Sequence, residues 1–62
     1  MITTTRTTLD GRSYDVVTDS DQINAPLCSY AQVYRIRADG SRGRKIVTTM
    51  IIFRAVKAAE AA

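Results

Sequence analysis

Cationic side chains gather in one short stretch of this chain, ADGSRGRK at residues 38 to 45. Guanidinium and ammonium groups at this density suit contact with phosphate or carboxylate groups, because they donate charge-assisted hydrogen bonds to such anions. The glycines within the stretch predict a turn, which places the charges at the tip of a hairpin. The basic hairpin over residues 35 to 45 is therefore the candidate site. Its candidate binding residues are Arg35, Arg37, Arg42, Arg44, Lys45 and Tyr34.

The charge along the chain is divided unevenly, although the formal net charge is only +3. Residues 1 to 31 hold two cationic and four acidic side chains, which gives −2, and residues 32 to 62 hold seven cationic and two acidic ones, which gives +5. Such asymmetry points to nucleic acid or another anionic partner. It predicts a small non-enzymatic binding or regulatory protein, with nucleic acid as the first choice of partner.

The arginine-rich strand has two interpretations. In the first, Arg35 and Arg37 contact phosphates with little dependence on base sequence, and Tyr34 offers a ring on which a base stacks. In the second, Asp15 and Asp19 of a neighbouring strand neutralise these arginines, and the tyrosine belongs to the core. The same charges also suit an acidic protein surface. The alternative function is thus a protein-interaction module, such as a stoichiometric inhibitor or adaptor of the kind that phages and mobile elements encode.

Catalytic and metal chemistry have little support in the sequence. Acid, base or nucleophilic catalysis needs a poised group and a partner that tunes it, yet the chain has no histidine and one cysteine. That residue, Cys28, is expected to be a small buried apolar side chain. The acidic segment DSDQIN, residues 19 to 24, lacks the third oxygen ligand, the turn glycine and the closing glutamate of a calcium loop. We expect no enzymatic activity, no metal and no cofactor.

A first hairpin is predicted over residues 2 to 19, because β-branched residues flank the turn dipeptide formed by Asp10 and Gly11. A two-residue turn at this point sets Arg6 directly opposite Asp15, which is a favourable cross-strand charge pair. The same register places three apolar side chains on one face. These are Leu9, Tyr14 and Val16.

The connector SDQINAPLCS, residues 20 to 29, joins this hairpin to the next one. Asp19 or Ser20 is a suitable cap for a single helical turn at its start. Its two large apolar residues, Ile23 and Leu27, are expected to fold back over the sheet as a lid on the core.

The second hairpin is predicted to end in a strand over residues 46 to 53, because residues 46 to 52 are β-branched except for Met50. A helix over residues 46 to 62 would also bury the apolar positions, so it stays an alternative. Such an apolar strand needs a neighbour. That neighbour is the first hairpin, a second copy of the chain in a homodimer, or the sheet of a target protein.

Two registers are open for this second hairpin. A two-residue turn at Asp39 and Gly40 sets Arg35 opposite Arg44, and like charges in that position are destabilising. A longer loop from Asp39 to Gly43 instead sets Ile36 opposite Ile46 and places Arg35 and Arg37 beside Lys45. The longer loop is preferred because it packs apolar side chains together. Tyr34 then pairs with Thr48, and Tyr30 with Ile52.

The alanine-rich tail over residues 54 to 62 predicts a short C-terminal helix that docks on the sheet. The fold class is thus a small α+β protein, mainly β, with two antiparallel hairpins in one sheet or half-open barrel. Residues 1 to 62 form a single domain. The start of the chain lacks the features of a secretory signal, and no apolar stretch is long enough to span a bilayer, so a cytoplasmic location without membrane contact is expected.

Overall fold

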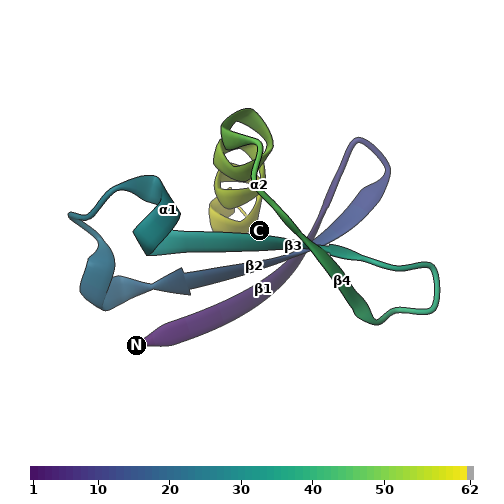
Figure 1. The fold of residues 1–62 in the computed structure, drawn as a ribbon, viewed down its shortest axis with the longest axis horizontal. Coiled ribbons are helices and arrows are strands. Elements are labelled where there is room, and N and C mark those ends of the chain that lie inside the picture. The colour runs from purple at the N-terminus through teal and green to yellow at the C-terminus, as the bar shows by residue number, and fades with distance from the viewer. Residues whose placement is uncertain (62) are drawn as a thin grey trace.

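The computed structural model describes residues 1 to 61. Four antiparallel strands form one open sheet in the order β1-β2-β3-β4, and a C-terminal helix packs against one face of it (Figure 1). The predicted small α+β fold of two hairpins in one sheet, with a C-terminal helix, is confirmed. The elements are β1 Ile2–Leu9, β2 Arg12–Asp19, the 3-10 turn η1 Ser20–Gln22, α1 Leu27–Tyr30, β3 Ala31–Ile36, β4 Arg42–Ile46 and α2 Thr49–Ala61.

The first hairpin has the predicted register. Leu9 pairs with Arg12, and Arg6 pairs with Asp15. Asp10 has a φ of 54° and Gly11 a φ of 79°, the two positive values that a type I′ turn requires. The apolar side of β2 therefore faces α2, and its opposite side carries the Arg6 and Asp15 pair.

The second hairpin has neither of the two predicted turns. Its tip is a three-residue loop in which the Arg37 carbonyl accepts a hydrogen bond from Gly40 N (2.9 Å) and Arg37 N donates one to the Ser41 carbonyl (2.8 Å). Gly40 has a φ of +89°, where glycine avoids the strain that a side chain brings. A tight turn followed by a left-handed glycine is a common hairpin loop.

The ladder below this loop also differs from the preferred register. Ile46 pairs with Val33 and not with Ile36, and Lys45 pairs with Tyr34. The predicted partnership of Ile36 with Ile46 is therefore wrong, as are those of Tyr34 with Thr48 and of Tyr30 with Ile52. The observed register buries Ile46 beside Val33, which is fully buried, so apolar contact is gained on the central strand and not near the tip.

The predicted strand over residues 46 to 53 is wrong, because α2 begins at Thr49 and runs to Ala61. Ile52 N donates the first helical hydrogen bond to the Thr48 carbonyl (3.0 Å). Tertiary packing overrides the strand preference of the β-branched residues, since a helix places apolar side chains at three- and four-residue spacing on one face. That face packs on the sheet. It comprises Ile51, Ile52, Ala55, Val56 and Ala59.

The core lies between α2 and the two central strands. Val16 of β2 and Val33 of β3 are cross-strand partners and are the largest fully buried side chains. Ala55 and Val56 of α2 close over them. Exposed apolar side chains also lie just before α2 and in its first turns. Val47, Met50 and Phe53 are 82%, 67% and 50% exposed.

The connector begins as predicted and then departs from the prediction. Asp19 caps η1 by accepting a hydrogen bond from Asp21 N (3.0 Å). Leu27 packs against the core as expected, but Ile23 is exposed and does not act as a lid. Cys28 is exposed as well, contrary to the prediction, because it lies on the short helix α1 that precedes β3. No helix within residues 1 to 61 has the length and apolarity needed to cross a bilayer.

Both hairpin tips project beyond α2 at the same end of the molecule (Figure 1). The tip of the first hairpin and the loop between β3 and β4 diverge there. The N-terminus lies at the opposite end, where the amino group of Met1 contacts Asp21 (3.1 Å) and Asp19 (3.5 Å). The two hairpins thus form a fork, and any group held between the tips meets both of them.

Candidate functional site

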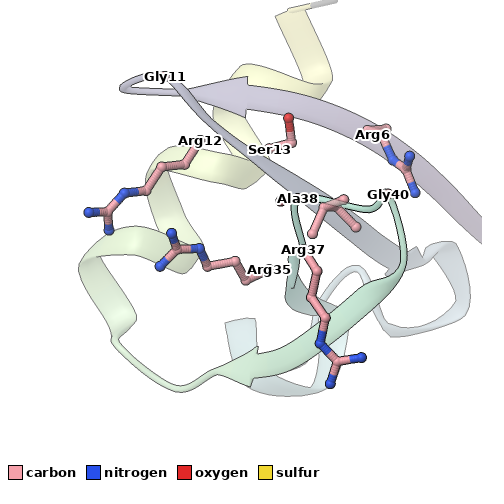
Figure 2. A pocket seen from close by; sticks show the side chains of 9 residues that line it. Arg6, Gly11, Arg12, Ser13, Arg35, Arg37, Ala38 and Gly40 are labelled. Carbon is pink, nitrogen blue, oxygen red and sulfur yellow. The ribbon is translucent and has the colours of Figure 1, made fainter.

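An open depression of about 460 Å³ lies between the two hairpin tips. One wall is the end of the first hairpin, from Gly11 to Ser13, and the other is the end of β3 with its loop, from Arg35 to Ala38 together with Gly40. Arg6 also lines it. The lining combines arginines with small side chains, so the guanidinium groups dominate its chemistry (Figure 2).

Arg12 and Arg35 reach toward the same side of this depression (Figure 2). The register explains why. Tyr14 pairs with Arg35, and Arg12 is two residues from Tyr14 along β2. Both arginine side chains therefore project from the face of the sheet that α2 covers. Arg37 extends in another direction. The two hairpins therefore contribute cations to one place from different parts of the chain.

A second depression of about 460 Å³ adjoins the first one on the β4 side. Arg35 and Arg37 line both depressions, and Arg44 lines only the second one. Arg6, which lines the first depression, is paired with Asp15 (3.0 Å). Within residues 1 to 61, no carboxylate forms an ion pair with any of the four other arginines that line the two depressions. We call these four the tip arginines. They are Arg12, Arg35, Arg37 and Arg44.

The uncovered face of the sheet carries a different pair, Arg6 and Arg42, which we call the open-face arginines. Asp15 is only 6% exposed, and its Oδ1 accepts from Arg6 Nε (3.0 Å) while its Oδ2 lies 3.5 Å from a terminal nitrogen of Arg42. The hydrogen bond from Arg6, with the charges of both arginines, lowers the pKa of Asp15 despite its burial. This carboxylate therefore ties β1, β2 and β4 together.

Tyr34 belongs to the same uncovered face. The guanidinium of Arg42 lies over its ring, 4.6 Å from the centroid, and its hydroxyl donates to Gln32 Oε1 (2.8 Å). Lys45, its cross-strand partner, is exposed on that side too. Of the candidate residues, Arg35, Arg37 and Arg44 thus line one depression. The structure does not place Arg42, Lys45 or Tyr34 with them. The predicted position of Arg35 and Arg37 beside Lys45 is wrong, because Lys45 lies on the face of Tyr34.

Four of the other carboxylates have partners away from the tip arginines. Asp19 and Asp21 contact the N-terminal amino group, and Asp10 pairs with Arg54 (3.1 Å). Asp39 accepts hydrogen bonds from the hydroxyl (2.7 Å) and backbone N (3.0 Å) of Ser41, which lower its pKa. The predicted neutralisation of Arg35 and Arg37 by Asp15 and Asp19 is therefore wrong.

Arg12 is the residue that sequence reasoning missed. It lies in the half of the chain with net negative charge, so the division of charge by halves concealed it. The signal that identifies it is the alternation of side chains along β2, because Arg12 shares a face with Tyr14 and lies at the hairpin tip. Arg12 lies near Arg35 only because β2 pairs with β3, and no local motif specifies that pairing.

No protein-family model, curated protein or solved structure matches this chain. The function is therefore inferred from the site itself.

Proposed function

We propose that this protein binds nucleic acid through its phosphate backbone, using the tip arginines. The observation that carries the proposal is that arginines from both hairpins surround adjoining depressions without a carboxylate partner in the described chain. A cluster of like charges is unfavourable in the isolated protein, and a polyanion offsets it. Phosphate contacts of this kind supply affinity without base specificity.

Base stacking is not part of the proposal. The ring of Tyr34 is covered by Arg42, and its hydroxyl is already bonded to Gln32. A base would have to displace the guanidinium to reach that ring. We therefore expect affinity to depend on salt and on phosphate density far more than on base sequence.

The test is a fluorescence-anisotropy titration of a short labelled duplex and of its single strands across about 50 to 200 mM salt. The variant Arg12→Ala/Arg35→Ala removes two tip arginines, and Lys45→Ala/Lys57→Ala is the charge-matched control. Both control lysines are exposed and lie away from the depressions. We expect the tip variant to reduce the slope of log affinity against log salt by about 2 and the control to reduce it much less.

Two results would contradict the proposal. One is an absence of binding at low salt, and the other is an equal loss of slope in the two double variants. A third titration uses polyglutamate of matched charge. If polyglutamate binds more tightly than the nucleic acids, the site prefers carboxylates, and an acidic protein surface replaces nucleic acid as the partner.

A separate observation favours contact with a protein as a second candidate function. Val47, just before α2, and Met50 and Phe53, in its first turns, are exposed apolar residues that line neither depression. Apolar side chains at this position suit a protein surface better than they suit phosphate. Sedimentation of the protein over a range of concentrations tests self-association through this surface, with Phe53→Ser as the variant. A monomer at every concentration contradicts it.

A further inference from the structure

The second depression is built around a β-bulge in the basic hairpin. Tyr34 pairs with Lys45, but the next pair toward the tip is Ile36 with Arg42. One residue of β3, Arg35, therefore faces two residues of β4, which are Gly43 and Arg44. Bulges of this kind redirect side chains and are frequent beside functional sites.

Gly43 is the residue that makes this arrangement fit. A Cβ atom at Gly43 would lie 2.9 Å from the Arg35 carbonyl oxygen, 3.2 Å from Arg37 Cγ and 3.5 Å from Arg37 Nε. The side chain of Arg37 thus lies across the backbone of β4 in the space that a glycine leaves open. The bulge therefore places three arginines around the second depression: Arg35 opposite it, Arg37 across it and Arg44 within it. The guanidinium groups of Arg35 and Arg37 extend in different directions there (Figure 2).

The charge of this cluster is uncompensated in the described part of the chain. The nearest acid in sequence is Asp39, and its Oδ1 is already bonded to the backbone N and hydroxyl of Ser41. Asp15 is bonded to Arg6 and Arg42 on the other face. The open space of about 460 Å³ lies among the three arginines.

We propose that Arg35, Arg37 and Arg44 form a discrete subsite for one phosphate group at the bulge. A tetrahedral phosphate offers several acceptor oxygens, which several planar guanidinium groups approaching from two strands can share. A bound phosphate also offsets the repulsion among the three cations, so its binding stabilises the hairpin. The inference rests on the proposed function for the source of the phosphate, which is the backbone of a nucleic acid and not a free ion.

The test is an NMR titration that follows the backbone amides of Gly43 and Arg44, with the Gly11 amide as the reporter for the first depression. Inorganic phosphate is added in one series and a short oligonucleotide in another, at constant ionic strength. The variants are Arg44→Ala and, as the charge-matched control on the same strand, Lys45→Ala. Thermal melting in phosphate and in chloride is recorded for all three proteins.

We expect phosphate to shift the Gly43 and Arg44 amides and to raise the melting temperature of the wild type and of Lys45→Ala. In Arg44→Ala, the shift of Gly43 and the gain in melting temperature should be lost, while melting in chloride should be no lower than in the wild type. Unshifted Gly43 amides, or an equal response in both variants, would overturn the subsite.

The two titration series separate this inference from the proposed function. If the oligonucleotide binds and shifts Gly11 but not Gly43, the subsite is wrong and nucleic-acid binding stands. If inorganic phosphate shifts Gly43 and the oligonucleotide does not bind, the subsite stands as a site for free phosphate and the proposed function is wrong. If neither ligand shifts any of these amides, both are wrong.

Discussion

The open-face arginines and the tip arginines are the same residue type in two opposite situations. Arg6 and Arg42 share the buried carboxylate of Asp15, and Arg42 also stacks on Tyr34. The tip arginines surround solvent-filled depressions and have no carboxylate partner within residues 1 to 61. The two groups are only a few residues apart in sequence, and Arg42 and Arg44 lie on one strand.

A count of cations therefore does not by itself locate a binding site. Charges that already have an acid partner and a stacking partner stabilise the fold, and they would have to break those contacts to meet a ligand. Charges without partners are the ones that an anion can neutralise at little cost. We therefore expect the open-face arginines to matter for stability and the tip arginines to matter for binding.

The largest expected effect is that of Asp15→Asn, which removes the acid that the open-face arginines share. The change leaves two guanidinium groups facing a neutral amide, and we expect the free energy of unfolding to fall by about 2 to 3 kcal/mol. Urea denaturation measures it. Asp21→Asn is the control, because Asp21 is exposed and its loss should change stability by less than about 0.5 kcal/mol. Equal effects of Asp15→Asn and Asp21→Asn would show that the contacts of Asp15 with the open-face arginines do not stabilise the fold.

Gly43→Ala tests whether the bulge, which lies between Arg42 and Arg44 on β4, positions the tip arginines of the basic hairpin. The added methyl group would meet the Arg35 carbonyl oxygen at 2.9 Å, so the bulge has to shift. We expect a loss of about 1 to 2 kcal/mol in unfolding free energy, together with weaker nucleic-acid binding. Ala38→Gly, in the same hairpin loop, is the control. Retention of wild-type stability and affinity by Gly43→Ala would show that the bulge does not position the tip arginines.

Arg42→Ala and Arg44→Ala form the sharpest comparison, since the two residues lie on one strand and each change removes one charge. Arg42→Ala loses the Asp15 contact and the stacking on Tyr34, so stability should fall by about 1 kcal/mol. The salt dependence of binding should stay close to that of the wild type. Arg44→Ala should keep its stability and reduce the salt slope by about 1. A reversed pattern would exchange the roles assigned to the two groups.

The smallest effect is a dependence of stability on acid pH. Because the folded-state pKa of Asp15 is lowered, its contribution is complete above the pKa of the unfolded chain and is lost as the pH falls through the folded value. The wild type should therefore lose part of its advantage over Asp15→Asn as the pH falls below about 4. Urea midpoints of both proteins across the acid range measure this convergence. A constant difference down to the lowest pH would mean that the Asp15 charge does not stabilise the fold.

The parts of the fold that could be predicted from the sequence are those with local causes. The turn at Asp10 and Gly11 determines the register of the first hairpin and thereby the pairing of Arg6 with Asp15. The helical preference of the alanine-rich tail is also local. These features follow from one dipeptide and from side-chain propensities.

The parts that escaped prediction depend on contacts distant in sequence. Ile51 and Ile52 prefer a strand locally, but packing on the sheet makes them helical. The bulge at Gly43 changes the register of the basic hairpin in a way that the pairing of apolar residues did not indicate. For the site, three of its four arginines were expected to be there. Arg12 was not, because only the pairing of β2 with β3 brings it to Arg35.

The position of the amino terminus has a practical consequence. β1 runs for eight residues from that end to the hairpin tip, and at about 3.3 Å per residue the terminus is roughly 26 Å from the fork. The contacts of its amino group with Asp19 and Asp21 are exposed, and such pairs contribute little to stability. A fluorophore, an affinity tag or a sensor surface attached there would leave both depressions facing the solution, so immobilised protein should bind as freely as dissolved protein does.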